Sequence, residues 1–401
     1  MANVSSSNGL EKRPRLRFPG FDEPYKQCRI GDIYAERSQR GASDMELLSV
    51  TMNDGVKPRS EIEGKDNSSE DKSNYKIVRK GDMVYNSMRM WQGANGISPC
   101  DGIVSPAYTV LMPKQEINNG YFAALFKSVT LINEFRKNSQ GMTSDTWNLK
   151  YPQIETIKVQ IPSVSEQDKV SELFSVLDER IATQAQLVES LKKYKRGVVR
   201  TLLSPKHCKL KNVEWTTAKI GDIGTFIKGA PLSKADISSD GTPFILYGEL
   251  YTTYNEVISK VVRKTQASVD KQYYSRIGDV IIPTSGETPE EISTASCVML
   301  PDIILAGDLN IYRCTQVDGR IMSYILNHVV NDRIARVAQG KSIVHVQATE
   351  ISKIEITYPD LISQKKLIET FDAITARIEQ SMRELELMQV HRKALLQQLF
   401  I

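Results

Sequence analysis

The sequence predicts an α+β protein with an internal pseudo-twofold repeat, in which two similar globular domains are joined by two long antiparallel helices that form a coiled coil. Three observations predict this fold. Apolar residues recur in alternating steps of four and three over residues 163–204, and the same pattern returns over 360–401. The segments before the two patterns also share short motifs in the same order. A repeat offset close to half of 401 residues indicates a duplicated unit.

The two helical patterns agree position by position. Polar residues interrupt both at the same two places, Gln184 and Lys195 in the first helix and Ser381 and Arg392 in the second, where polar side chains can fix register. The remaining positions form the predicted seam: Val170, Phe174, Leu177, Ile181, Val188, Leu191, Val198 and Leu202, matched by Leu367, Phe371, Ile374, Ile378, Leu385, Met388, Leu395 and Leu399. We expect antiparallel packing in which Val170 faces Leu399.

The ends of these helices carry recognisable signals. Ser163 is a predicted N-cap that forms a capping box with Glu166, and Asp360 is the predicted N-cap of the second helix. The first helix is expected to stop at 204, before a proline. Basic residues cluster in its last turns, where we expect them to complement the helix dipole: Lys192, Lys193, Lys195, Arg196 and Arg200.

Short strands are expected to open and close each globular half. The opening strand carries an Ile-Gly-Asp-Ile core, at 30–33 and 220–223, and the closing strand, at 157–161 and 354–358, leads into the long helix. The expected divisions are a loose arm at 1–25, globular domains at 26–162 and 205–359, and helices at 163–204 and 360–401.

Between these strands both halves repeat a second set of signals. A Gly-Asp turn leads into an apolar strand at 81–84 and again at 278–281. One amphipathic helix is expected to follow in each half, over 121–139 and 321–339, with Gly141 and Gly340 placed as C-caps. A polar stretch at 51–74 is expected to be a long loop and has no counterpart in the second half.

Composition narrows the functional class without deciding it. With 40% hydrophobic residues the chain is globular, and no apolar run is long enough to span a membrane. The five cysteines are scattered and the four histidines are isolated, so disulfides, a metal site and a His-based catalytic triad are not expected. The N-terminus lacks the apolar segment of a secretory signal, which favours the cytoplasm. A net charge of +4 permits nucleic-acid binding without demonstrating it.

Taken in order, these motifs resemble the specificity subunit of a type I restriction-modification enzyme. The resemblance spans essentially the whole chain and depends on motif order rather than on one motif. It is carried by the Ile-Gly-Asp-Ile openers, the Gly-Asp strands, Gln-Gly at 140–141 and 339–340, and Ser-Glu-Gln-Asp-Lys at 165–169.

The resemblance implies a role without catalysis in this chain. Each globular domain would be a target recognition domain that reads one half of an asymmetric, bipartite double-stranded DNA target. The helices would set the spacing and dock two methyltransferase subunits and, through them, restriction and translocase subunits of a prokaryotic cytoplasm. S-adenosylmethionine, ATP and Mg²⁺ would belong to those partners. The alternative is a scaffold whose domains bind protein or glycan, and a self-sufficient nuclease or methyltransferase comes third.

Loop residues supply the DNA-binding candidates, because Arg, Asn, Gln and Glu can pair with base edges and small polar residues beside glycine suit phosphates. Trp91 is equally interpretable as a packed anchor, and an ordinary surface loop is the alternative for each residue. The base-reading candidates are Ser87, Arg89, Trp91, Gln92 and Asn95 in the first domain and Thr284, Ser285 and Glu287 in the second. The phosphate candidates are Thr143, Ser144, Lys228, Ser233, Lys234, Lys341 and Ser342.

Overall fold

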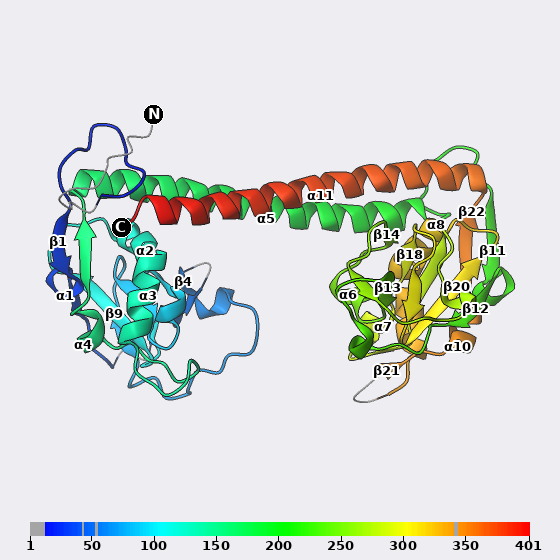
Figure 1. Ribbon diagram of the computed structural model, residues 1–401. Helices are drawn as coiled ribbons and strands as arrows, with labels where there is room; N and C mark the ends of the chain where they lie inside the picture. The colour runs from blue at the N-terminus through cyan, green and yellow to red at the C-terminus, as the bar shows by residue number, and fades with distance from the viewer. Residues whose placement is uncertain (1–12, 42–43, 53–54, 341–343) are drawn as a thin grey trace. The chain divides into compact units, whose positions relative to one another are not determined.

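The structure, a computed structural model, describes residues 13–41, 44–52, 55–340 and 344–401. The chain divides into two compact units, one made of residues up to 185 together with 383–401 and the other of residues 186–382. Two long helices, α5 (Val164–Leu202) and α11 (Leu361–Gln398), pass from one unit into the other. Each unit therefore contains one globular head and part of each long helix (Figure 1). Residues 26–162 are called head 1 and residues 205–359 head 2.

Head 1 is built around a four-stranded antiparallel sheet with strand order β2-β9-β6-β7. Its strands are β2 (Tyr34–Glu36), β9 (Tyr108–Pro113), β6 (Met83–Asn86) and β7 (Asn95–Ile97). Three strand pairs accompany it: β1 (Lys26–Arg29) with β10 (Lys158–Ile161), β3 (Leu48–Thr51) with β4 (Gly55–Pro58), and β5 (Lys76–Val78) with β8 (Gly102–Val104). The helical segments are α1 (Ile30–Ile33), η1 (Arg59–Glu61), η2 (Met90–Gln92), α2 (Asn119–Leu125), α3 (Val129–Asn138) and α4 (Tyr151–Ile154).

Head 2 repeats this arrangement with additions. Its main sheet has the order β12-β20-β16-β18-β14, with β12 (Gly224–Lys228), β20 (Leu309–Cys314), β16 (Asp279–Pro283), β18 (Ser296–Val298) and β14 (Val257–Ile258). Smaller sheets are β15 (Arg263–Thr265), β13 (Thr242–Leu246) and β19 (Ile304–Ala306); β17 (Ser285–Gly286) and β21 (Val344–His345); and β11 (Trp215–Lys219) and β22 (Glu355–Pro359). The helical segments are η3 (Ile220–Asp222), η4 (Lys234–Asp236), α6 (Glu249–Thr252), η5 (Lys271–Tyr273), α7 (Pro289–Ile292), α8 (Gly319–His328), α9 (Asn331–Val337) and α10 (Ala348–Ser352).

The repeated Gly-Asp motifs have the same physical cause in both heads. Gly81 and Gly278 have φ angles of +91° and +93°, a left-handed conformation that favours glycine. The carboxylates of Asp82 and Asp279 then accept hydrogen bonds from backbone N–H groups three residues earlier, at 2.8 and 2.9 Å. The glycine turns the chain and the aspartate closes the turn, so β6 and β16 begin at equivalent places.

The expectation that Ile-Gly-Asp-Ile forms a strand is wrong. The motif follows the opening strand and makes a helical turn, α1 in head 1 and η3 in head 2. In α1 both isoleucines are fully buried, because residues three apart lie on the same side of a helical turn. Glycine is required by close approach, since a Cβ at Gly31 or Gly221 would lie 2.9 Å from the Cβ of Glu155 or Ser352.

The expectation of a single helix in each half is also wrong, because two shorter helices occupy that segment in each head. Helix α2 ends at Leu125, and Ser128 is the N-cap of α3, where its side chain accepts a hydrogen bond from the backbone N–H of Leu131. Head 2 breaks in the same place, between α8 and α9. The glycines expected as C-caps lie two residues beyond the caps, in hairpins that follow the helices.

The described part of the N-terminal segment is not a loose arm. Arg17 donates from Nε and Nη2 to the buried Glu166 carboxylate at 2.9 and 2.8 Å, and the Tyr25 hydroxyl donates at 3.1 Å. Leu16 N–H donates to the carbonyl of Gln398 at 2.9 Å. The segment thus connects the start of α5 to the end of α11, and Glu166 serves this contact rather than a capping box. The polar stretch at 51–74 likewise includes β4 and η1.

The long helices are antiparallel and all sixteen predicted seam residues are buried or half-buried. In the first unit the rings of Phe174 and Phe400 stack at 5.8 Å between centroids. Gln184 donates to Glu384 at 3.1 Å, and Arg392 Nη2 donates to Asp178 at 2.9 Å. Both polar pairs lie within one residue of the expected register.

The buried helix faces are wider than the predicted seam near each head. In the second unit Val199 and Leu203 join Leu367, Ile368 and Phe371 in the core of head 2. In the first unit Leu396 and Phe400 join the core of head 1. Residues next to the heptad positions are buried because the helix ends pack against a head as well as against each other. Among the described residues, no helix is long and apolar enough to cross a membrane.

Lys195, one of the basic residues expected to complement the helix dipole, makes a buried ion pair. Its Nζ donates to the Glu256 carboxylate at 2.8 Å, and His328 Nε2 lies 2.7 Å from the other carboxylate oxygen. Burial alone would raise the pKa of the Glu256 carboxyl, but the hydrogen bond with His328 and the charge of Lys195 outweigh it and lower the pKa to about 2. This buried group joins α5 to head 2.

Candidate nucleic-acid interface

Each head is attached to its long helix by one buried glutamine. In the first unit, Gln167 Oε1 accepts from the backbone N–H of Asn118 at 3.0 Å, and its Nε2 donates to the carbonyl of Pro162 at 3.1 Å. In the second unit, Gln364 makes the same two bonds, both at 2.8 Å, to the N–H of Asp318 and the carbonyl of Pro359. Because Asn118 and Asp318 cap α2 and α8, the glutamines fix those helices on the long helices.

In both heads the loop after the Gly-Asp strand docks on the hairpin after the small helices. The carbonyl of Ser87 accepts from Leu149 N–H at 2.8 Å, and the carbonyl of Thr284 accepts from Val346 N–H at 3.0 Å. The hairpins are closed by paired backbone bonds between Gln140 and Asn148 in head 1, and by an equivalent pair in head 2. The structure therefore brings the predicted base-reading loops next to the predicted phosphate-contacting segments.

Two of the head 1 candidates do not face solvent. The Ser87 side chain is 4% exposed and hydrogen-bonds to the Thr109 hydroxyl at 2.8 Å. Asn95 is fully buried in β7, and its Nδ2 donates to the carbonyl of Gly93 at 3.0 Å. The Ser87 hydroxyl and the Asn95 Nδ2 have partners inside the head, whereas the Asn95 Oδ1 is buried without a hydrogen-bond partner in the described chain. Neither side chain faces solvent, so neither is placed to touch a base in this conformation.

Trp91 matches the packed-anchor interpretation. Its Nε1 donates to the carbonyl of Met88 at 3.0 Å, and its ring meets the ring of Trp147 edge to face at 5.2 Å between centroids. The Arg136 guanidinium lies 5.8 Å from the same ring. These contacts hold the two loops together. The exposed candidates beside them are Arg89, Thr143 and Ser144, and Gln92 is half-buried.

Head 2 corrects one further candidate. Ser285 is 4% exposed and donates to the Asp308 carboxylate at 2.9 Å, so it is not free to contact a base. Ser233 and Lys234 are exposed, and Ser233 caps η4 by accepting from Ala235 N–H at 3.2 Å. Glu287 is exposed just before α7. Lys341 and Ser342 lie outside the described residues.

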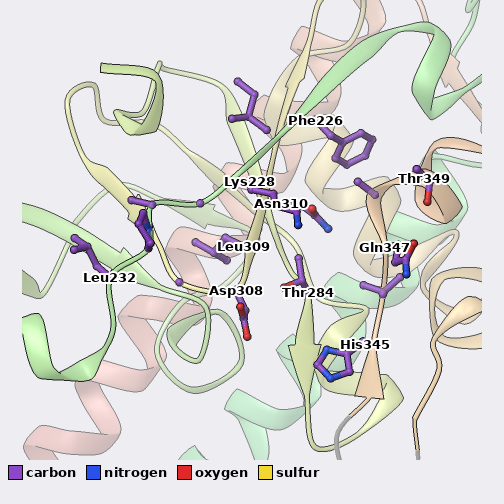
Figure 2. A pocket seen from close by; sticks show the side chains of 17 residues that line it. Phe226, Lys228, Leu232, Thr284, Asp308, Leu309, Asn310, His345, Gln347 and Thr349 are labelled. Carbon is purple, nitrogen blue, oxygen red and sulfur yellow. The ribbon is translucent and has the colours of Figure 1, made fainter. Parts of the chain in front are cut away.

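A cavity of about 870 Å³ opens in head 2 between β12, β20 and the segment that runs from β21 into α10 (Figure 2). It brings together Lys228 and Thr284, both predicted from the sequence, with polar residues that sequence reasoning missed. The missed residues are Asp308, Asn310, His345, Gln347 and Thr349. One signal could have found Asn310, which interrupts the apolar side of the strand over 309–314.

The described residues contain no group of three or more His, Cys, Asp or Glu side chains arranged to hold a metal ion. The two heads have exposed polar loops, and equivalent sheets and main-chain hydrogen bonds support these loops in both heads. Such surfaces suit hydrogen bonding to a polar polymer.

Comparison with known proteins identifies the framework. The family model described as "Type I restriction modification DNA specificity domain" matches twice, over residues 23–193 and 212–388. The chain belongs to this family. The resemblance drawn from motif order to type I specificity subunits is therefore confirmed, and each family match covers one head and most of the long helix that follows it.

Relatives of this family resemble the whole chain at low identity. The type I restriction enzyme MjaVIII specificity subunit of Methanocaldococcus jannaschii is 21% identical over 347 residues, which cover 80% of this chain and 78% of the relative. The putative MjaX specificity subunit of the same organism is 22% identical over 294 residues, covering 69% of this chain and 65% of the relative.

Solved structures share the fold. The S subunit of a type I restriction-modification system from M. genitalium has a TM-score of 0.57 at 14% identity, covering 97% of this chain and 99% of that chain. A chain from a study of the assembly and conformational transition of the type I restriction-modification system has a TM-score of 0.61 at 13% identity, covering 95% of this chain and 98% of that chain.

Proposed function

We propose that this chain is the DNA-reading and assembly subunit of a type I restriction-modification complex, in which each head reads one half of an asymmetric, bipartite double-stranded target. The observation that carries the proposal is the presence of two DNA specificity domains with one framework and different surfaces. Identical readers would favour a symmetric target, because equal surfaces recognise equal sequences. Unlike readers favour two unlike half-sites.

Base reading is assigned to side chains that the framework leaves exposed or half-buried. In head 1 these are Arg89 and Gln92, and Arg can donate two hydrogen bonds to guanine. In head 2 they are Thr284 and Glu287, together with the polar lining of the cavity. Phosphate contacts are assigned to exposed residues near these surfaces, and they would position each head without reading sequence. Those residues are Thr143, Ser144, Lys228, Ser233 and Lys234.

The long helices are proposed to set the spacing between the half-sites and to dock two methyltransferase subunits. Large apolar side chains remain exposed on both helices, which supports a docking role because isolated helices seldom expose several of them without a partner. They include Val176, Leu187 and Tyr194 on α5 and Met382, Leu387 and Val390 on α11. Methyl transfer with S-adenosylmethionine and ATP- and Mg²⁺-dependent cleavage would then occur in the partner subunits of a prokaryotic cytoplasm.

The test is to produce the full chain with its methyltransferase partner and map methylated adenines across a bacterial genome. A gapped motif with two unlike halves is expected, and exchanging residues 26–160 for those of a relative should change one half only. Random or absent methylation would contradict the proposal.

A salt titration gives a second, independent measurement. Binding to a target duplex should weaken steeply with salt, because each neutralised phosphate contributes a slope of about −0.9 in log K against log salt. Lys228→Gln should reduce that slope by about 0.9 while leaving the recognised motif unchanged. A salt-independent affinity would point to a protein or glycan ligand instead.

A further inference from the structure

In head 2 one buried amide, that of Asn310, has a nitrogen without a hydrogen-bond partner. Asn310 is 2% exposed, and its Nδ2 has no hydrogen-bond partner within the described chain. The residue lines the cavity, and Figure 2 shows it near the centre of the lining, with Phe226, Thr284 and Gln347 around it. A buried amide nitrogen without a partner destabilises the free protein. Head 1 also has buried unpaired atoms, Tyr85 Oη, Asn95 Oδ1 and Asn148 Oδ1, so what distinguishes Asn310 is its position in the lining of the cavity.

The equivalent position in head 1 is satisfied. Strand pairing places Asn310 opposite Ile282 in head 2 and Thr109 opposite Tyr85 in head 1, and these strands follow equivalent Gly-Asp turns. Thr109 is bonded to Ser87 at 2.8 Å, and the counterpart of Ser87 after the repeated strand is Thr284. The pair that closes head 1 is therefore replaced in head 2 by two residues that line a cavity.

The chemistry of the lining favours a nucleobase over a phosphate. Phosphates are held chiefly by cations and backbone N–H groups, whereas amides match the paired donors and acceptors of base edges. Here two amides, Asn310 and Gln347, accompany one lysine, and the aromatic ring of Phe226 forms part of the wall. The cavity volume of about 870 Å³ falls within the usual range for small-molecule sites, about 300–1,000 Å³.

The depth of Asn310 in the cavity limits how a base could reach it. Base edges in a duplex are recessed in the groove by about 8.5 Å, and Asn310 is itself recessed in the cavity. The two meet only when the base leaves the stack and enters the cavity. Since Nδ2 is covered in the free chain, rotation of the amide about its last torsion, which has a broad two-fold preference, would turn it toward the ligand.

We propose that the head 2 cavity receives one unstacked nucleobase of the half-site that head 2 reads, and that Asn310 is the specificity-determining residue that pairs with it. This inference rests on the proposed DNA-reading function. It adds a binding site, a ligand class and a residue to that function. The matched head 1 position carries a threonine that is hydrogen-bonded to Ser87 in place of an amide with an unpaired nitrogen, so no equivalent pairing residue is expected there.

The test uses the full chain in complex with its methyltransferase partner and a duplex carrying a fluorescent base analogue at one half-site position at a time. One position other than the methylated base should brighten severalfold on binding, because stacking no longer quenches it. Asn310→Leu should abolish that signal and reduce discrimination at the same position by about 5- to 150-fold, the range for a well-paired base contact. Extrusion of the methylated base by the partner should persist as an internal control.

Thermal unfolding separates a reading role from a structural one. Asn310→Leu should leave the Tm unchanged or raise it, because it removes an unpaired buried amide. Thr109→Val is the matched control, which should lower the Tm by breaking the bond to Ser87 and leave the head 2 half-site intact.

A lowered Tm for Asn310→Leu with an unchanged motif would overturn the inference, as would a wild-type complex that extrudes no base beyond the methylated one. Failure of the proposed function itself would look different, since the wild-type complex would then produce no gapped motif at all.

Discussion

Head 1 and head 2 hold their recognition loops with equivalent main-chain hydrogen bonds and differ in the side chains placed beside them. The bond between Ser87 and Leu149 has its counterpart between Thr284 and Val346. Head 1 fills the neighbouring space with a hydroxyl pair and a tryptophan pair, whereas head 2 leaves a cavity. The difference teaches that the backbone framework is separable from the side chains beside the loops, because these side chains differ between the heads while the main-chain bonds are the same.

The comparison also extends to the helix cores, where the largest effects are expected. Phe174→Ala and Phe371→Ala remove equivalent buried rings from the two units, and each should lower the free energy of unfolding by about 3–5 kcal/mol. Urea unfolding measures this, with Val176→Ala, at an exposed site on α5, as a control that should cost little. A large loss of unfolding free energy for only one of the two variants would show that the two rings contribute unequally to stability.

The second-largest expected effect is a dependence of stability on pH that arises in the second unit. The pKa of Glu256 is lowered from 4.5 to about 2, so its ionised form stabilises the second unit in full above pH 4.5 and loses this effect as pH falls toward 2. The contribution is at most about 3 kcal/mol. Urea unfolding at pH 7, 5 and 3 should show Glu256→Gln losing stability mainly at pH 7 and converging on wild type in acid.

The first unit offers the control for this prediction. Asp178→Asn removes a more exposed ion pair with Arg392 and should cost no more than about 1 kcal/mol. Equal losses of stability for Glu256→Gln and Asp178→Asn at pH 7 would contradict this prediction. The buried Glu256 carboxylate would then stabilise the protein no more than an exposed ion pair does.

The glutamine attachments should have a smaller effect than the buried rings, and a more local one. Gln167→Leu and Gln364→Leu each leave one N–H and one carbonyl without their partner, at a cost of about 1–3 kcal/mol. Hydrogen exchange is the sharper measurement, because protection should fall at the start of α2 for the first variant and of α8 for the second. Loss of protection throughout a unit would indicate that the glutamine supports the whole fold rather than one attachment.

Periodicity made the long helices predictable, while tertiary contacts decided much of the rest. Alternating spacing predicts the seam and its register, as Asp178 with Arg392 shows. A four-residue segment such as 30–33 carries no period, and its turn is set by docking of Gly31 against Glu155. Ser128 is an N-cap residue inside an apolar pattern that looks continuous in the sequence, so the break between α2 and α3 is easily missed.

The reading surfaces were the least predictable part. Polar loop residues look alike in sequence whether they face solvent or the interior, so Ser87, Asn95 and Ser285 could not be told apart from Arg89. The cavity around Asn310 forms from four segments far apart in the chain, and only the fold brings them together.

The attachment through Gln167 and Gln364 has a consequence for how freely the sequence of a head can change. Each glutamine bonds only to main-chain atoms of its head, the N–H that caps a small helix and the carbonyl of a proline. Main-chain atoms are the same in every sequence, so these two hydrogen bonds depend on the backbone geometry of the head and not on particular side chains. A head can therefore accumulate side-chain substitutions and still make these two hydrogen bonds to its long helix.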